Sequence, residues 1–237
     1  MLKFFTFKWG DKYGPEYVNR LYGSLKVNYN KPFQLICYTD NSLGIHKDVV
    51  IEDIQSLRKY NTNRVFTYEK LVLMEFHPTG IWLDLDILIH KNITKNVERV
   101  INNDELDFVM IWNHWNNYEN KSLQWWGKGS SCHINSSFVY FDRPQWLIDF
   151  TKKHWHKIEW TYKSLDKYLF YQHFRTNRLE FWPDNIFSNY NKEWFTLKNK
   201  ITLFNTSHIK ANNLLEVAYE LHEAKDEVIE LWKSYDK

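Results

Sequence analysis

The apolar residues of this chain recur in two different periods, and together these periods predict an α/β architecture. Four apolar runs in the first half have the length and composition of buried strands. They span residues 2–9, 33–39, 49–51 and 81–90. Apolar residues at helical spacing lie between these runs, from Pro15 to Leu25 and from Arg64 to Phe76. Because strands and helices alternate, we expect a mostly parallel twisted sheet with helices on both faces.

The second half predicts a less regular set of elements. Strands are expected at 107–112, 133–141 and 201–204, with a short strand or extended turn at 181–183. Helices are expected from Pro144 to about Lys157, from Ser164 to Phe174, and as a charged amphipathic helix from Asn213 to Tyr235. Ser164 suits the N-cap position. The chain has no internal repeat and no low-complexity linker, so we expect residues 1–237 to form a single domain.

Composition narrows the function classes. Of the 237 residues, 43% are hydrophobic and the net charge is +2, so a basic nucleic-acid footprint is absent. The two cysteines, Cys37 and Cys132, form no disulfide framework, and we expect Cys37 to be a free buried thiol. We find neither a signal-peptide pattern at the N-terminus nor a run long enough to span a membrane, which favours a soluble cytoplasmic protein.

The aromatic content of 18%, with 12 Trp, is unusually high. Some of these rings must belong to the core. Aromatic faces also form platforms for sugars and bases, so a stacked ligand is a second expectation.

The acidic run Ile81–His90 carries the clearest chemical signal. If the run is one strand, Asp84 and Asp86 point to the same side, because side chains two apart on a strand share a face. Two carboxylates on a buried strand repel each other, and a divalent cation such as Mg²⁺ or Mn²⁺ would relieve that repulsion. In the alternative reading the strand ends near Leu83 and both carboxylates are solvated in a loop. A D-x-D spacing also occurs often by chance.

Topology suggests where further ligand-binding residues lie. In open α/β sheets, ligands bind outside the carboxyl ends of the strands. This rule places three short segments at one edge of the predicted sheet. They are Lys8 with Trp9, Thr39 with Asp40, and Asp84 with Asp86.

Several of these segments, in this order, resemble motifs of the GT-A glycosyltransferases that use nucleotide-sugar donors, in particular glycogenin and the lipopolysaccharide glycosyltransferases. The most specific match is a helix with Arg64 and Lys70-Leu71 that leads into Leu83-Asp84-Leu85-Asp86. It is preceded by strands ending in Phe7-Lys8-Trp9 and Thr39-Asp40, and followed by Asn135-Ser136-Ser137, which resembles an Asn-Ser-Gly strand beneath the donor sugar. The resemblance spans about residues 1–210.

The resemblance implies a GT-A-like fold, a Mn²⁺ or Mg²⁺ cofactor, a nucleotide-sugar donor such as a UDP- or GDP-sugar, and a carbohydrate acceptor. It divides the domain into a nucleotide-sugar half at 1–110, an acceptor half at 111–210 and a terminal helix at 211–237. Metal ligands would be Asp84, Asp86 and His208. The implied donor-binding residues are Phe7, Lys8, Trp9, Thr39, Asp40, Arg64, Lys70, Asp84, Asn135, Ser136 and Lys210.

This sequence departs from the family pattern at three places. The segment from Phe204 to Lys210 lacks the Gly and Pro that often follow the family's metal-binding His. Ser137 replaces the Gly of Asn-Ser-Gly, and Asp166-Lys167 stands where Asp-Gln or Asp-Glu is common. A structural reading remains open for each basic candidate: Arg64 and Lys70 as solvated helix charges, and His208 as a surface or capping residue.

The catalytic group and the acceptor site are the least specific assignments. Asp166 and Asp184 are the candidates for a base or nucleophile, although Asp also favours helix starts and turns. The acceptor candidates Trp112, His114, Trp115 and Trp126 lie in or next to a long predicted loop, 113–129, rich in Asn, Trp and Gly. Core packing is the alternative role for these rings.

Two rival functions share part of this pattern. A nucleotidyltransferase also combines a doubly wound sheet with metal-binding carboxylates, but Phe7-Lys8-Trp9-Gly10 is not a glycine-rich phosphate loop. A non-catalytic carbohydrate-binding protein would explain the Trp content without explaining the paired aspartates behind a basic helix.

Overall fold

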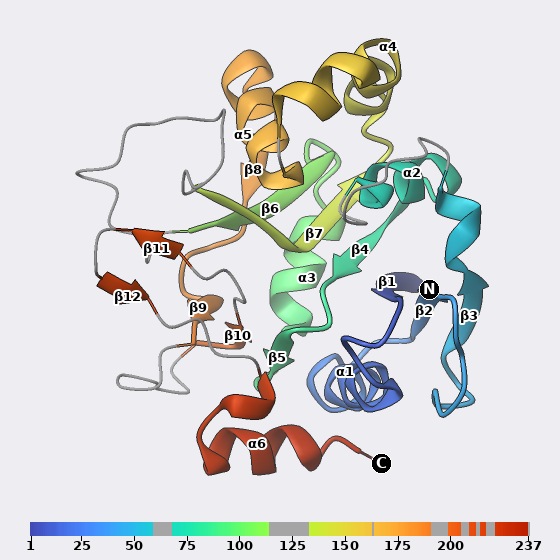
Figure 1. Ribbon diagram of the computed structural model, residues 1–237, viewed down its shortest axis with the longest axis vertical. Coiled ribbons are helices and arrows are strands. Elements are labelled where there is room, and N and C mark those ends of the chain that lie inside the picture. Colours follow the sequence, from blue (N-terminus) through green and yellow to red (C-terminus); the bar gives the residue numbers. More distant parts are fainter. Residues whose placement is uncertain are drawn as a thin grey trace.

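A seven-stranded sheet runs through the centre of the computed structural model (Figure 1), in the strand order β3-β2-β1-β4-β7-β6-β8. The structure describes residues 1–58, 68–113, 133–162, 164–190, 199–204, 209–211, 214–216 and 221–236. The strands of this sheet are β1 (Leu2–Lys8), β2 (Phe33–Thr39), β3 (Val50–Asp53), β4 (Thr79–Leu83), β6 (Phe108–Trp112), β7 (Ile134–Asp142) and β8 (Glu180–Phe181).

The mixed pairing of these strands brings several strand ends to one edge. β1 is parallel to β2 and β4, β2 to β3, and β6 to β8, whereas β7 runs antiparallel to β4 and β6. The predicted mostly parallel sheet is therefore confirmed. Because β7 is antiparallel to β4, its first residues lie beside the carboxyl end of β4, where Leu83 pairs with Phe138.

Helices cover both faces of the sheet, as the alternating pattern predicts. α1 (Pro15–Asn28), α3 (Thr94–Ile101) and α6 (Asp226–Lys233) contribute to one apolar core. α2 (Glu69–Phe76), α4 (Gln145–Thr161) and α5 (Leu165–Thr176) contribute to the other, together with the 3₁₀ turn η1 (Ile54–Leu57). Within β1, Phe4 belongs to the first core and Phe5 to the second, because successive side chains of a strand face opposite sides.

Local sequence signals set several helix ends as predicted. Pro15 occupies the first turn of α1, and the Ser164 hydroxyl accepts a hydrogen bond from the Lys167 amide at the start of α5. α5 ends at Thr176, two residues past the predicted end at Phe174, and its C-cap Asn177 has a left-handed backbone (φ 52°). α4 extends to Thr161, four residues past the predicted end at Lys157. Cys37 is a buried free thiol.

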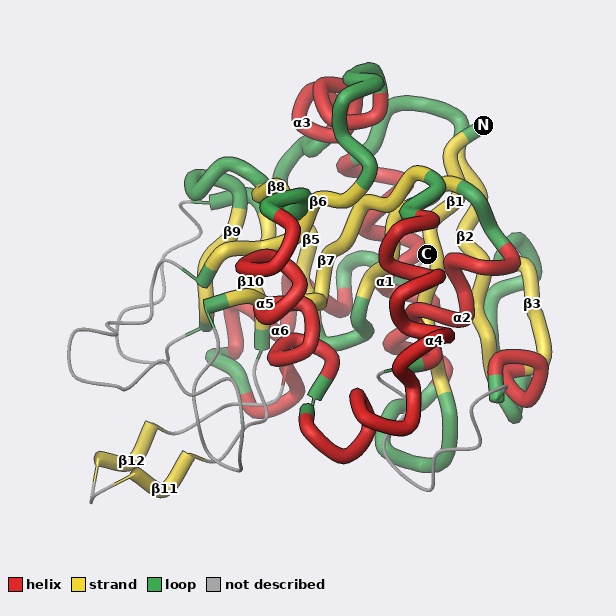
Figure 2. Tube along the Cα trace, turned by 90° about the horizontal axis from the view of Figure 1, so that it is seen from above, coloured by secondary structure: helices red, strands yellow, loops and turns green. Residues whose placement is uncertain are grey.

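The prediction of one continuous strand from 81 to 90 is wrong, and the alternative of a strand end near Leu83 is confirmed. β4 ends at Leu83, and residues 87–89 form a separate strand, β5 (Ile87–Ile89), in a second sheet. In that sheet, β10 (Ile201–Leu203) pairs with β5 and with β9 (Phe187–Asn189) (Figure 2). The chain thus changes sheets at Asp84–Asp86, so the two carboxylates escape the interior of a continuous buried strand.

The prediction of a single helix from Asn213 to Tyr235 is also wrong. Leu214–Glu216 form strand β12, which pairs with β11 (Ile209–Ala211), and a 3₁₀ turn, η2 (Leu221–Glu223), precedes α6. The apolar residues that suggested one helical stripe are divided between elements, with Leu221 in η2 and Trp232 in α6. No helix among the described residues is long and apolar enough to cross a membrane.

Candidate active site

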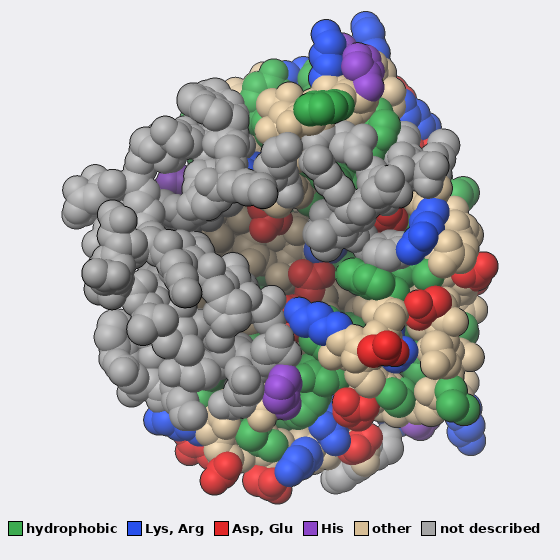
Figure 3. Space-filling view, in the orientation of Figure 1, with side chains coloured by type: hydrophobic (Ala, Val, Ile, Leu, Met, Phe, Trp, Pro, Cys, Tyr) green, Lys and Arg blue, Asp and Glu red, His purple; other side chains and the backbone are tan. Residues whose placement is uncertain are grey.

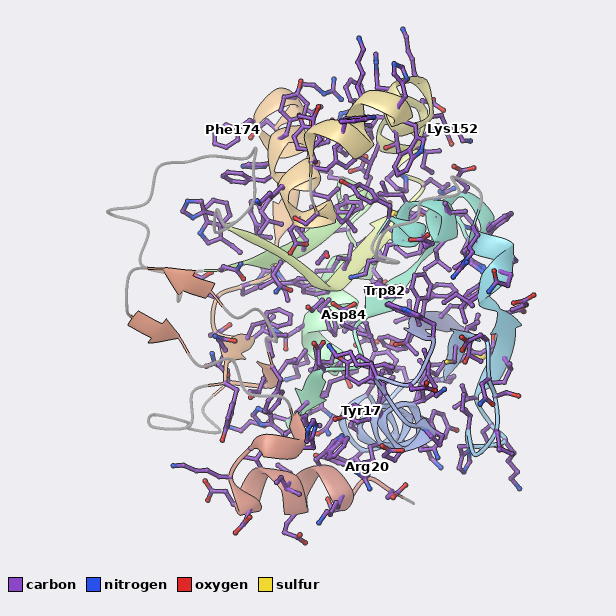
Figure 4. The ribbon with its side chains drawn as sticks, in the orientation of Figure 1. Tyr17, Arg20, Trp82, Asp84, Lys152 and Phe174 are labelled. Atoms are coloured by element: carbon purple, nitrogen blue, oxygen red, sulfur yellow. The ribbon has the colours of Figure 1, made fainter. Side chains whose placement is uncertain are left out.

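The acidic segment Asp84–Asp86 lies at the junction of the two sheets and is fixed to both. The Asp84 amide donates to the carbonyl of Ser137 in β7 (2.9 Å), and the Phe204 amide, after β10, donates to the carbonyl of Asp86 (3.0 Å). Leu85 is buried between them, whereas both aspartate side chains are half-buried. Asp84 therefore sits at the centre of the molecule, next to Trp82 (Figure 4).

Asp84 is held by a buried lysine and by an indole. Its Oδ1 lies 2.8 Å from Lys70 Nζ and accepts a hydrogen bond from Trp82 Nε1 at 2.7 Å. Lys70 is only 5% exposed. Its Nζ also donates to the carbonyl and hydroxyl oxygens of Ser136 at 3.0 and 3.3 Å, and it lies over the Trp82 ring. A buried ammonium needs such partners, so Lys70 is not a solvated helix charge.

Asp166 joins this group from α5. Its Oδ1 accepts a hydrogen bond from the Ser136 amide at 3.1 Å. Burial raises the pKa of Asp166, while the Ser136 hydrogen bond and the charge of Lys70 act in the opposite direction. Lys70, Asp84, Ser136 and Asp166, which we call the Lys70 cluster, thus form one connected set of side chains and backbone groups. The neighbouring Asn135 side chain contacts its own strand: its Oδ1 accepts a hydrogen bond from the Ser137 amide at 2.8 Å.

Asp86 faces a loop that our reading of the sequence did not single out. The Tyr13 hydroxyl donates to Asp86 Oδ2 at 3.3 Å. Burial and the adjacent charge of Asp84 raise the pKa of Asp86 to about 7, and the positive charge of Lys12 opposes that rise. Lys12 and Tyr13 follow β1 at the carboxyl edge of the sheet. Ligands bind outside the carboxyl ends of the strands in such sheets, so the loop residues directly after β1 could have been predicted as candidates by the same rule.

The ends of β1 and β2 meet at the same edge, as expected. The Gly10 amide donates to Asp40 Oδ2 at 3.0 Å, with Gly10 in a left-handed conformation (φ 58°). Lys8 Nζ donates to the Asn41 carbonyl at 3.3 Å, and the Thr39 hydroxyl also bonds to Asn41. Phe7 packs edge-on against Trp82 with ring centroids 3.9 Å apart, and Trp9 is half-buried beside the same core.

Two further candidates lie away from these contacts. Trp112, at the end of β6, stacks on His133 with ring centroids 5.1 Å apart and packs edge-on against Phe181. Asp184 lies in an exposed turn between β8 and β9. The side chains of the remaining candidates lie outside the described residues, and for Lys210 only the backbone, in β11, is described. These are Arg64, His114, Trp115, Trp126, His208 and Lys210.

The two aspartates have the donor chemistry that Mg²⁺ or Mn²⁺ requires. These cations use one or two carboxylates and complete their shell with water and phosphate oxygens. Within the described parts of the chain, no cluster of three His, Cys, Asp or Glu side chains could hold a metal. A cation at Asp84 and Asp86 would therefore draw its other ligands from a phosphate-bearing substrate, from water, or from the segment that holds His208.

The surface around the site is hollowed. Figure 3 shows acidic side chains at the bottom of a recess near the middle of one face, next to Lys or Arg side chains at its rim. A negative floor beside positive groups fits a cation together with a phosphorylated ligand better than it fits an uncharged ligand.

Comparison with known proteins rests on structure alone, because no family model and no curated protein sequence matches this chain. The galactosyltransferase LgtC, solved with donor and acceptor sugar analogues, aligns with a TM-score of 0.65 at 10% identity, over 98% of this chain and 96% of its own. Mouse xyloside xylosyltransferase 1 aligns with a TM-score of 0.58 at 11% identity, over 86% of this chain and 98% of its own.

A third structure agrees. GlyE of Streptococcus pneumoniae, a glycosyltransferase, aligns with a TM-score of 0.56 at 10% identity, over 99% of this chain and 60% of its own. At such low identity the likeness establishes architecture only. The chain therefore has the fold of these enzymes, the GT-A glycosyltransferase fold.

Proposed function

We propose that this protein is a metal-dependent glycosyltransferase, which moves a sugar from a nucleoside-diphosphate sugar to a carbohydrate acceptor. The observation that carries the proposal is the Lys70 cluster beside Asp86, at the carboxyl edge of a GT-A sheet. In this kind of sheet, ligands bind at that edge. The named galactosyl- and xylosyltransferases share the fold and support the reaction class.

Glycosyl transfer breaks the bond between the anomeric carbon and the diphosphate, so negative charge grows on the leaving group. Asp84 and Asp86 would hold Mn²⁺ or Mg²⁺, which would supply a Lewis acid to stabilise this charge. Asp86 is the better direct ligand, since Lys70 and Trp82 already occupy Asp84 Oδ1. Lys12, exposed in the loop after β1, is placed to meet the diphosphate as a counter-charge.

Lys70 positions the site from beneath. It fixes one oxygen of Asp84 and orients the start of β7 through Ser136. Because Lys70 holds Asp84 in one rotamer, Asp84 would present its carboxylate to a cation in a fixed orientation. We assign Lys70 and Trp82 to positioning, and Ser136 and Asn135 to the floor beneath the sugar.

Asp166 is the stronger of the two candidates for a group next to the sugar. It is half-buried and connected to Ser136, and burial raises its pKa above the usual value of an aspartate, which makes its carboxylate a stronger base. If transfer inverts the anomeric configuration, Asp166 is the base that takes the acceptor proton. If transfer retains it, Asp166 instead orients the sugar from below. Asp184 lies in an exposed turn, so a contact with substrate would require the acceptor to reach that turn.

The acceptor proposal rests on Trp112 and on the tryptophans that follow it in the chain. Trp112 lies at the same sheet edge as the Lys70 cluster, because β6 ends where β7 begins, with Trp112 paired to Ile134. An aromatic face near a donor site suits the apolar face of a sugar ring. His114, Trp115 and Trp126 remain predictions for the same role.

The decisive experiment measures nucleotide-sugar turnover and nucleotide binding separately. Purified protein is screened against UDP- and GDP-sugars with Mn²⁺, with Mg²⁺ and with chelator, and donor hydrolysis and transfer are followed. We expect turnover only with metal, and a higher melting temperature with nucleoside diphosphate plus metal than with either alone. Metal-independent binding of free sugars without turnover would identify a carbohydrate-binding protein. Transfer of the nucleotidyl group would identify a nucleotidyltransferase.

Matched variants locate the chemistry. Asp86→Asn should abolish turnover and the metal-induced gain in melting temperature while keeping the fold. Asp104→Asn, an exposed aspartate away from the site, should behave as wild type. If folded Asp86→Asn protein turns over donor at the wild-type rate, the metal assignment fails.

A further inference from the structure

The outer side of α4 carries a regular stripe of basic side chains and one exposed ring. Lys153, His156, Lys157 and Trp160 are spaced i, i+3, i+4 and i+7, so they share one face of the helix, and all four are exposed. Trp160 is 78% exposed, whereas Leu147 and Ile158, on the opposite face, are buried in the core. The helix is thus held firmly by its inner face while its outer face combines positive charge with an aromatic side chain.

Arg175 near the end of α5 and Arg178, just after the helix, add two arginines to this face. Between α4 and α5 lies a groove of about 360 Å³, with Lys153, Arg175 and Arg178 among its lining residues. Its floor is aromatic, because the Arg175 guanidinium lies over the Phe150 ring and that of Arg178 over the Trp146 ring. We call Lys153, His156, Lys157, Trp160, Arg175 and Arg178 the α4 surface.

Positive charge dominates the α4 surface. Partial desolvation and the charges of Lys153, Lys157, His156 and Arg175 together lower the pKa of His154, which lies on the same helix. The acidic side chain in the groove, Asp149, already accepts a hydrogen bond from Gln145. Figure 3 shows Lys, Arg and His side chains gathered at this end of the molecule.

We propose that the α4 surface binds an anionic membrane surface, with the lysines and arginines meeting lipid phosphates and Trp160 entering the headgroup region. Clusters of Lys and Arg are attracted to anionic lipid headgroups, and Trp side chains are enriched at the membrane–water interface. A single basic ion site would explain the groove but not the exposed indole. The whole chain carries a net charge of only +2, so the attraction is local to this end.

The geometry leaves the candidate active site accessible. α4 lies at the end of the molecule farthest from α6, and the carboxyl end of β4 lies between them (Figure 1). Docking through α4 would thus place the recess of Figure 3 to the side of the contact, near the membrane surface but not against it. A membrane-linked or membrane-adjacent acceptor could reach such a site. The binding itself does not depend on the proposed glycosyltransferase activity.

Vesicle sedimentation tests the proposal with the full chain. Phosphatidylcholine vesicles are compared with vesicles that contain about 30% phosphatidylglycerol, at low and high salt. We expect binding only to the anionic vesicles, weakened at high salt. Each lysine near an anionic surface contributes about a fivefold factor in the partition coefficient, so Lys153→Ala with Lys157→Ala should reduce binding roughly 25-fold. Trp160→Ala should reduce it severalfold with no loss of charge.

The controls match spacing and chemistry. The double variant Lys95→Ala with Arg99→Ala removes two exposed cations from α3 at the same i, i+4 spacing. Phe76→Ala removes an aromatic side chain that is 55% exposed, as a control for Trp160→Ala. Both should bind anionic vesicles within about twofold of wild type. The proposal is overturned if wild type ignores anionic vesicles, or if the α3 pair loses as much binding as the α4 pair. Competition by inorganic phosphate at low millimolar concentration, or retention of single-stranded RNA without vesicle binding, would also overturn it.

Discussion

Lys70 holds together side chains from three elements, since it contacts Asp84 after β4 and Ser136 in β7 from its own position in α2. We expect Lys70→Met, which keeps most of the volume, to lower kcat/KM for the donor about 10- to 100-fold, as is typical when a supporting partner of a metal ligand is lost. Acceptor KM should change little. Steady-state kinetics with each substrate varied in turn separate the two effects.

The matched control for this change is another lysine–carboxylate pair. Lys233 lies 3.3 Å from Glu230 on the surface, with both side chains exposed, and Lys233→Met removes this pair without touching the Lys70 cluster. This variant should keep wild-type donor kinetics, because an exposed pair contributes about 0–1 kcal/mol to stability. Equal donor kinetics in both variants would reduce Lys70 to a structural residue.

Asp86 carries a second residue-level prediction, on stability against pH. Its pKa rises from 3.8 to about 7 in the folded protein. The folded chain therefore holds a proton that the unfolded chain releases, and without metal the free energy of unfolding should fall as pH rises through this window and level off above it. Asp86→Asn should show a smaller fall and melt higher than wild type at about pH 8 in chelator. Melting curves across pH measure both. If the melting temperatures of wild type and Asp86→Asn changed in parallel with pH, the raised pKa of Asp86 would be contradicted.

At the scale of elements, the C-terminal residues are clasped to α1. Arg20 on α1 pairs with Asp236 at 3.1 Å and lies over the Trp232 ring, and Tyr17 packs against the same ring (Figure 4). Gly23 allows this approach: a Cβ at that position would come within 2.0 Å of the Tyr235 carbonyl oxygen. The close contact makes Gly23 a packing requirement of α1.

Gly23→Ala tests that requirement with a clear sign. Helix propensity alone favours Ala over Gly by about 1 kcal/mol, so a helix without the contact would become more stable. We expect the opposite, a loss of about 1–3 kcal/mol, because the methyl group displaces the C-terminal segment. Urea denaturation measures it, with Lys26→Ala on the exposed side of α1 as the control. A stabilised Gly23→Ala protein would show that the C-terminal segment moves away from α1 without loss of stability.

The elements that could be predicted from the sequence are those whose signals are local. Phe33–Thr39 is a strand because its apolar run is bounded by turn residues, and α5 starts where Ser164 can cap it. The local sequence left two readings open at Asp84–Asp86, one continuous strand or a strand end near Leu83. It could not decide between them, because β5 leaves the main sheet to pair with β10, far along the chain. The prediction of one C-terminal helix was wrong for the same reason, because β12 is defined by its pairing with β11 and not by its local sequence.

Within the site, motif-bearing residues were predictable and supporting contacts were not. The sequence pattern predicts roles for Lys70, Asp84, Ser136 and Asp166, and the structure brings these four residues together. Tyr13 was missed because its role depends on where a loop after β1 folds, and no local pattern encodes that position. The acceptor role of the loop at 113–129 stays a prediction, because all of this loop except Asn113 lies outside the described residues.

At the scale of the whole molecule, the site lies where two sheets meet and where both helical layers contribute. α2 and α5 supply Lys70 and Asp166 from one layer, while the loop before α1 supplies Tyr13 from the other. The small sheet lies beside the large one, and the segment between β4 and β5 joins them (Figure 1). A ligand bound to Asp84 and Asp86 therefore contacts a residue tied to each sheet.

That double attachment has a consequence for hydrogen exchange. The Asp84 amide is bonded to the large sheet through Ser137, and the Phe204 amide closes the small sheet onto Asp86. If the two sheets open at this seam, both amide protons become exchangeable in the same event. A nucleoside diphosphate bound with metal across the two carboxylates should close the seam, so both amides should slow together by a similar factor. Mass spectrometry of peptides spanning residues 84 and 204 would measure it. Protection of one amide without the other would show that the sheets move independently.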